Sequence, residues 1–111
     1  MKRVFISGAL NSFTEEKGFL DNVHRMLKMA GKVRNAGFAV YVPCNDILTS
    51  ISNGGLKHEE YYAHDLVWLG VCDAMILTPG WEGSKGVMGE ISYAKKHGIP
   101  VCRTLEELEL I

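Results

Sequence analysis

The chain has 111 residues, the usual length of one domain, and its 47% hydrophobic and 23% charged residues are the composition of a folded protein rather than a disordered one. Its formal net charge of -1, from 12 Lys+Arg against 13 Asp+Glu, argues against duplex DNA or an anionic membrane as the main partner, because both require a basic surface. No apolar run reaches the roughly 18 residues that span a bilayer, and the apolar stretch after Met1-Lys2-Arg3 is too short for a signal peptide.

The cysteines and histidines form no disulfide or metal pattern. The three cysteines are odd in number and widely spaced, which favours reduced thiols and a cytoplasmic location. The histidines do not have the spacing of zinc ligands with these cysteines, so neither a metal site nor a cofactor is expected. The residues concerned are Cys44, Cys72, Cys102, His24, His58, His64 and His97.

The chain opens with a short strand and a long amphipathic helix. Val4-Phe5-Ile6 is an apolar run that stops at Ser7-Gly8, which predicts a buried strand followed by a turn. Apolar side chains recur at helical spacing from about Gly18 to Asn35, which predicts a helix with one face in the core. Gly37 follows this helix and is expected to cap its C-terminus.

A second strand, a long loop and a second helix come next. The run from Phe38 to Val42 predicts a strand, which Pro43 ends. Residues from about Cys44 to Lys57 are rich in Asn, Ser and Gly and predict a loop long enough to be functional. Helical spacing then returns from His58 to about Gly70.

The third strand and third helix are separated by a glycine-rich turn. Cys72 to Thr78 is nearly all apolar, which is typical of a buried parallel strand. Pro79 to Gly83 breaks the chain. Ser84 is the expected N-cap of a helix that runs to about His97 and ends at Gly98.

The chain ends with a fourth strand and a short helix. Ile99 to Cys102 is the strand, and Thr104 is the expected N-cap of the helix from Leu105 to Leu110, with Glu107 placed as in a capping box. The order βαβαβαβα predicts an α/β fold: a flavodoxin-like or Rossmann-like three-layer sandwich with a parallel sheet of four or five strands, in a single domain of residues 1–111.

Three loops are expected to line a ligand site, because such sheets bind ligands at the carboxyl ends of their strands. They are the segments Ser7 to Thr14, Cys44 to Lys57 and Pro79 to Ser84. The small residues Ser7 and Gly8 would let a ligand approach the backbone, and the alternative is an ordinary turn after the strand.

Two carboxylates border the predicted core. Glu90 lies about 60° from the centre of the apolar stripe of its helix, and Asp65 has the same offset on the preceding helix. Burial raises the pKa of a carboxyl group, whereas a helix N-terminus lowers it. The alternative is two half-exposed acids in ion pairs, but two acids beside loops at one end of a sheet favour a site.

A glycine-rich segment from Gly80 to Glu90 opens the third helix and presents backbone N–H groups suited to an anion. Ser84 and Lys85 add further donors, although the segment is neither a dinucleotide fingerprint nor a Walker loop. The alternative is a helix cap with glycines for close packing. Trp81 is placed to stack on a base or sugar, whereas Tyr62 is expected in the core.

Nearly the whole chain resembles the nucleoside 2-deoxyribosyltransferase superfamily, which includes the 2'-deoxynucleoside 5'-monophosphate N-glycosidases. The strongest segment is Ser84-x-Gly86-Val87-x-x-Glu90. The other matching segments are Phe5-Ile6-Ser7-Gly8, Gly37-Phe38-Ala39-Val40, His64-Asp65-Leu66-Val67-Trp68-Leu69 with Cys72-Asp73, and Ala94 with Gly98-Ile99-Pro100-Val101.

The resemblance implies a catalytic mechanism and a substrate. Glu90 would be the nucleophile that attacks the anomeric carbon of a 2-deoxyribose, and Asp65 would position and activate the substrate. Ser84, with Lys85 and Gly86, looks like a site for a 5'-monophosphate. The expected activity is hydrolysis of the N-glycosidic bond of a 2'-deoxynucleoside 5'-monophosphate through a covalent glutamyl-sugar intermediate.

Two alternatives to this function stay open, a deoxyribosyltransferase and a non-catalytic module that binds or senses nucleotides. The N-glycosidases carry a basic residue in the loop after the first strand, where this chain has Asn11. Because sites in this superfamily often borrow residues across an interface, the resemblance also implies a homodimer. The expected partner is otherwise a small-molecule nucleoside or nucleotide.

Overall fold

The protein is a four-stranded parallel sheet with helices on both faces. The computed structural model describes residues 1–10, 16–45 and 58–111. The strands are β1 (Arg3–Ser7), β2 (Ala39–Tyr41), β3 (Ala74–Leu77) and β4 (Val101–Cys102), and they pair in the order β2-β1-β3-β4. This order of parallel strands confirms the predicted flavodoxin-like three-layer α/β architecture.

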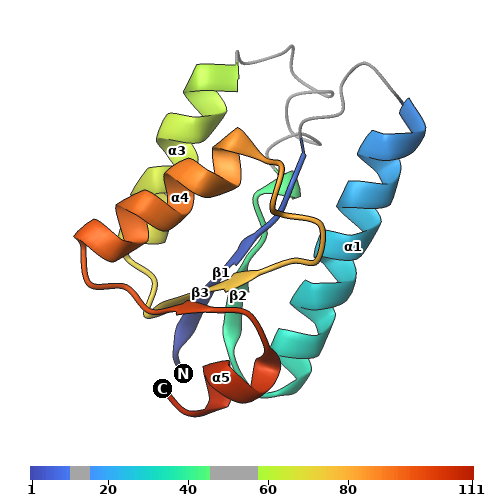
Figure 1. Ribbon diagram of the computed structural model, residues 1–111. Coiled ribbons are helices and arrows are strands. Elements are labelled where there is room, and N and C mark those ends of the chain that lie inside the picture. The colour runs from blue at the N-terminus through green and yellow to red at the C-terminus, as the bar shows by residue number, and fades with distance from the viewer. Residues whose placement is uncertain (11–15, 46–57) are drawn as a thin grey trace.

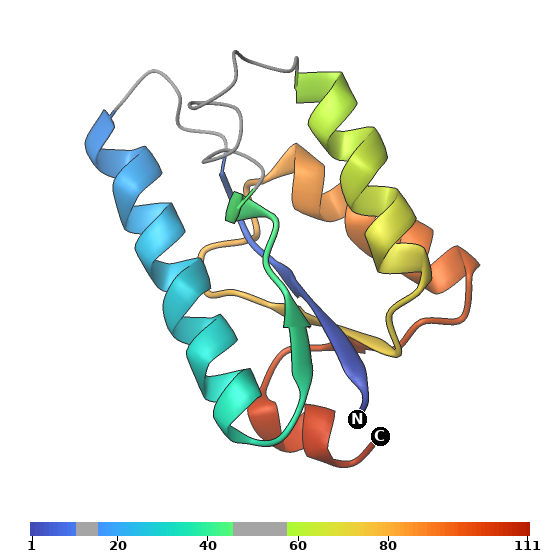
Figure 2. The ribbon, with the colours of Figure 1, turned by 180° about the vertical axis from the view of Figure 1, so that it is seen from behind.

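The helices form the two outer layers (Figures 1 and 2). They are α1 (Glu16–Asn35), α3 (His58–Gly70), α4 (Lys85–Lys96) and α5 (Leu105–Glu109). The helices α1 and α5 cover one face of the sheet, and α3 and α4 lie side by side on the other.

Two apolar cores lie on opposite faces of the sheet, because successive side chains of a strand point to opposite faces. Val4 and Ile6 of β1 pack on the side of α1 and α5, in a core that includes Met26. Phe5 packs on the side of α3 and α4 against residues such as Leu69. Ser7 follows Phe5 by two positions and therefore points toward α3 and α4.

Local stop and start signals match the predicted helix ends. Gly37 and Gly98 adopt the left-handed conformation, with φ of +99° and +70°, that favours glycine after a helix. The hydroxyl of Ser84 accepts the N–H of Val87 at 3.2 Å, which confirms Ser84 as the N-cap of α4.

The last helix is capped by Thr104, as predicted, but its capping box differs from the expected one. The hydroxyl of Thr104 accepts the N–H of Glu107 at 3.1 Å. In a capping box, the carboxylate of Glu107 would accept the N–H of the N-cap residue Thr104. Here it accepts the N–H of the preceding residue, Arg103, at 2.7 Å.

The strands β2, β3 and β4 are shorter than predicted, whereas β1 extends one residue beyond the predicted run Val4-Phe5-Ile6 at each end. For β4 the reason is local, because the N–H of Ile99 donates to the carbonyl of Ala94 at 2.8 Å and Pro100 has no N–H. Pairing therefore begins at Val101, although the carbonyl of Pro100 already accepts the N–H of Met75 at 2.9 Å. The first helix begins at Glu16 rather than Gly18.

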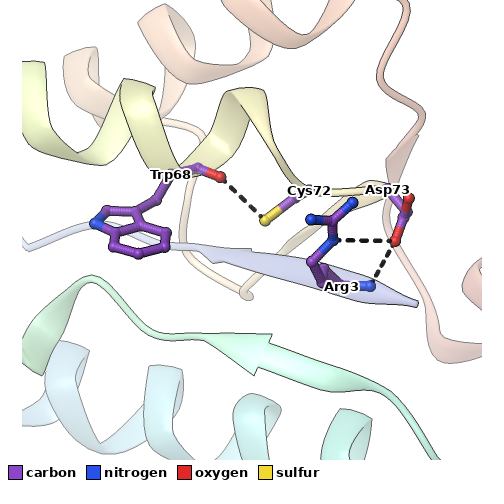
Figure 3. Close-up of polar contacts among 4 residues, drawn as sticks. All are labelled: Arg3, Trp68, Cys72 and Asp73. Carbon is purple, nitrogen blue, oxygen red and sulfur yellow. Dashed lines mark hydrogen bonds and ion pairs between the residues drawn. The ribbon is translucent and has the colours of Figure 1, made fainter. Parts of the chain in front are cut away.

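At the amino end of the sheet, Asp73 joins the turn before β3 to β1 (Figure 3). Its carboxylate accepts the backbone N–H of Arg3 at 2.7 Å and lies 3.7 Å from the guanidinium Nε. The backbone hydrogen bond, more than the guanidinium charge, lowers the pKa of Asp73. Next to it, Cys72 donates to the carbonyl of Trp68 at 3.3 Å, and burial raises the pKa of this thiol to about 11.

Candidate active site

The candidate site lies where the order of the strands reverses. The chain leaves β1 for β2 on one side and leaves β3 for β4 on the other, so the carboxyl ends of β1 and β3 form the switch point at which such sheets bind ligands. Ser7 ends β1 there, and its hydroxyl donates to Oε1 of Glu90 on α4 at 2.6 Å. Both side chains are buried, Ser7 at 0% exposure and Glu90 at 6%.

Glu90 is a buried acid whose protonation changes near neutral pH. Its burial confirms the helical phase predicted for it. Desolvation disfavours the carboxylate and raises its pKa to about 7, whereas the hydrogen bond from Ser7 acts in the opposite direction. A carboxyl pKa raised in this way toward neutral pH is typical of carboxyl groups with a chemical role.

Asp65 is the second buried acid, and it lies on α3 with an exposed fraction of 9%. The hydroxyl of Tyr41, at the carboxyl end of β2, donates to its Oδ1 in a long contact of 3.5 Å. The ring of Tyr41 stacks on Phe5 at 5.6 Å and on Trp68 at 5.4 Å. An aromatic stack from β1 to α3 therefore positions the hydroxyl that contacts Asp65.

Tyr62 lies at the contact between α3 and α4. A Cβ at Gly89 would be 2.1 Å from the Tyr62 hydroxyl oxygen, so this hydroxyl rests directly on the backbone of α4, beside Glu90. Burial, and secondly the charge of Glu90, raise the pKa of Tyr62. Tyr62 is only half-buried and belongs to neither apolar core of the described residues, so its expected place in the core is wrong.

Gly89 and Gly31 provide a matched pair for testing this contact. Both lie inside helices, where alanine is favoured over glycine by about 1 kcal/mol, and a Cβ at Gly31 would meet nothing within 4 Å. We expect Gly31→Ala to raise the free energy of unfolding by about that amount and Gly89→Ala to show no such gain, because Tyr62 must move. Urea unfolding measures both. An equal gain in the two variants would contradict the close contact.

At the start of α4, the Ser84 side chain has a structural role, and the predicted binding of an anion there stays a prediction. Ser84 is buried, and its hydroxyl is used by the cap. The N–H groups of Lys85 and Gly86 lie in the first turn, where helix geometry provides no intrahelical acceptor. Lys85 is exposed.

Gly8 has a packing reason to be glycine. A Cβ there would lie 3.0 Å from the methyl carbon of Met26 and 3.1 Å from the hydroxyl of Thr78. Thr78 is 2% exposed, and its hydroxyl has no hydrogen-bond partner in the part of the chain that the structure describes. Close packing explains Gly8 without a ligand, and its contact with a ligand stays a prediction.

Trp81 follows β3 and is partly buried against the core on the side of α4. The guanidinium of Arg103 lies over its ring, 5.7 Å from the centroid. Trp81 therefore already has a stacking partner within the protein, and its contact with a base or sugar stays a prediction.

Part of the predicted site lies outside the described residues, namely Asn11 with the rest of the first loop (11–14) and the loop segment 46–57. Within residues 1–10, 16–45 and 58–111 there is no group of three or more His, Cys, Asp or Glu side chains that would hold a metal ion. The helices of the same ranges include none that is both long and apolar enough to cross a membrane.

Two residues of the site were not identified from the sequence. Tyr41 sits at the end of a strand, which is the position at which parallel sheets present side chains to ligands. Gly89, a glycine inside a helix, was the available signal for the close approach of Tyr62. The structure thus groups Glu90 with Ser7 and Tyr62, and Asp65 with Tyr41, between the sheet and the adjacent helices α3 and α4.

The chain belongs to the family described as DUF4406, a domain of unknown function, whose model matches residues 2–103. This range runs from β1 through β4 and includes Ser7, Asp65 and Glu90. No curated protein and no solved structure matches the chain. The resemblance to the nucleoside 2-deoxyribosyltransferase superfamily stays a prediction from the sequence.

Proposed function

We propose that this member of the DUF4406 family hydrolyses the N-glycosidic bond of a 2'-deoxynucleoside 5'-monophosphate, with Glu90 as the nucleophile. The observation that carries the proposal is the buried hydrogen bond of 2.6 Å between Ser7 and Glu90 at the strand switch point. A carboxyl group with a pKa of about 7 can ionise near neutral pH. In a buried site, where water screens charges little, the carboxylate would stabilise a positively charged transition state strongly.

The reaction has two displacements at C1' of the sugar. The ionised carboxylate of Glu90 forms a bond to C1', while the C1'–N bond breaks and the base leaves with the electron pair and takes up a proton. Water then attacks C1', the ester bond to Glu90 breaks, and 2-deoxyribose 5-phosphate is released with the carboxylate restored. The transition states carry positive charge on the sugar, which a carboxylate stabilises.

Asp65 would orient the substrate or assist the leaving base as an acid. Its place on α3, one turn after Tyr62, puts it on the helix that packs beside α4 and Glu90. The N–H groups of Lys85 and Gly86 at the start of α4 would bind the 5'-phosphate.

Incubating the protein with each 2'-deoxynucleoside 5'-monophosphate and measuring free base tests the proposal. We expect base release from at least one nucleotide, and slower release from the corresponding nucleoside, which lacks the phosphate. If an added second base accelerates consumption of the nucleotide and appears in a new nucleotide, the protein is a transferase. Calorimetric binding with no release from any nucleotide would contradict catalysis and favour a sensing module.

A further inference from the structure

The outer face of α3 and the turn that follows it expose a group of apolar side chains. Val67 is 70% exposed, Trp68 52% and Val71 46%. They are neighbours on the helix surface, because residues three and four apart lie on one face. No charged residue occurs from Leu66 through Cys72, while Leu69 packs inward at 0% exposure. A helix that is apolar on its inner and outer sides is typically covered on both.

Trp68 is held in place before any partner arrives. Its ring stacks on Tyr41 with an interplanar angle of 18°, and Tyr41 in turn stacks on Phe5. A rigid, half-exposed tryptophan loses little conformational freedom on association, and such residues dominate the binding energy of protein interfaces. Trp68 is therefore suited to be the centre of a contact.

Opposite charges lie at the two ends of this face. Glu60, an exposed acid in the first turn of α3, lies seven residues before Val67 and therefore on the same face of the helix. Beside its other end lies Arg3, whose side chain is 59% exposed. Figure 3 shows Cys72 and Arg3 close together at the C-terminal end of α3, with Trp68 one turn earlier on the helix. The face thus runs from acidic through apolar to basic.

A surface with this order of charges is complementary to a second copy of itself. When two such helices pack antiparallel around a two-fold axis, the acidic end of each meets the basic end of the other and the apolar parts coincide. Arg3 already pairs with Asp73, but a guanidinium has five N–H donors and can bind a second carboxylate. The net charge of -1 adds little repulsion between copies.

We propose that α3 is the contact surface of a homodimer, in which two α3 helices pack antiparallel, Trp68, Val67 and Val71 form the centre, and Glu60 pairs with the partner's Arg3. This inference does not depend on the proposed enzymatic function. One helix face is smaller than the roughly 800 Å² per partner of a standard interface, so the dimer is expected to dissociate in about the micromolar range.

Sedimentation equilibrium across a range of protein concentrations tests the surface. The mass of the wild type should rise with concentration from 12.3 kDa toward twice that value. Val67→Lys should remain monomeric, whereas Leu27→Lys, which replaces a 48% exposed leucine on α1, should dimerise as the wild type does. A wild type that stays monomeric, or a Leu27→Lys variant that does, would overturn the proposal.

A mixing experiment tests the antiparallel arrangement. Glu60→Lys places like charges at both contacts of the dimer, and so does Arg3→Glu. The dimer dissociation constant of each variant alone should therefore be about tenfold or more above that of the wild type. In an equimolar mixture both contacts pair opposite charges again, and dimerisation should return to the wild-type level. Circular dichroism checks that each variant is folded. A mixture that associates no better than the separate variants would contradict this arrangement.

Discussion

Glu90→Gln is expected to abolish base release, by about a thousandfold or more, while making the protein more stable above pH 7. An amide keeps the size of the side chain and accepts the hydrogen bond from Ser7, but it is not a nucleophile. The loss of turnover without a loss of folding is the result that separates a catalytic carboxylate from a structural one. Initial rates of base release, measured with saturating nucleotide, provide the comparison.

The gain in stability follows from the pKa of the buried acid. Burial raises the pKa of Glu90 from 4.5 to about 7, so the folded state favours the neutral acid. The neutral acid therefore contributes to the free energy of unfolding. This contribution is fully present below pH 4.5 and is lost as the pH rises through about 7. Glutamine removes this loss, which is about 3 kcal/mol at pH 8.

Urea unfolding at pH 4.5 and pH 8 measures the difference. The two proteins should be nearly equal in free energy of unfolding at the lower pH and differ at the higher one. The control is Glu106→Gln, an exposed position on α5, which should change stability by less than about 0.5 kcal/mol at either pH. A Glu90→Gln variant that releases base at the wild-type rate would exclude Glu90 as the nucleophile.

Ser7→Ala is expected to shift the pH dependence of base release to higher pH. The hydroxyl of Ser7 stabilises the ionised carboxylate of Glu90, so its removal raises the pKa of Glu90 above its value of about 7. Hydrogen bonds to charged groups contribute about 1.5–3 kcal/mol, which corresponds to a shift of about one unit or more. At neutral pH the variant should therefore be slower than the wild type and recover at alkaline pH.

The profile of kcat/KM against pH measures this shift, because it reports the ionisation of the free enzyme. Ser92→Ala is the matched control, since Ser92 is an exposed serine on α4 two residues after Glu90. Its profile should coincide with that of the wild type. Equal profiles for Ser7→Ala and the wild type would show that the hydroxyl does not control the ionisation of Glu90.

The fold could be predicted from local signals because most of its elements carry them. Glycines in the left-handed conformation end α1 and α4, and a serine hydroxyl begins α4. Strand ends were less predictable, because apolar runs such as Ile99 to Cys102 do not reveal where backbone pairing starts. There the absence of an N–H on Pro100 decides the boundary.

The candidate site was predicted residue by residue but not as pairs. Helical phase identifies Glu90 and Asp65 as partly buried, since it depends only on neighbours along one helix. It does not reveal which strand residue meets each acid, and Ser7 is 83 residues away from Glu90. The contacts of Tyr41 with Asp65 and of Tyr62 with Gly89 likewise arise from how α3 packs on the sheet and on α4.

The central claim is that Glu90 forms a covalent bond to the sugar, and mass spectrometry of the rapidly quenched reaction tests it most directly. The account predicts a transient adduct with the mass of a 2-deoxyribose 5-phosphate group, located on the peptide that contains Glu90 and missing from Glu90→Gln. Base release without any adduct on that peptide, or an adduct that persists in the glutamine variant, would contradict it.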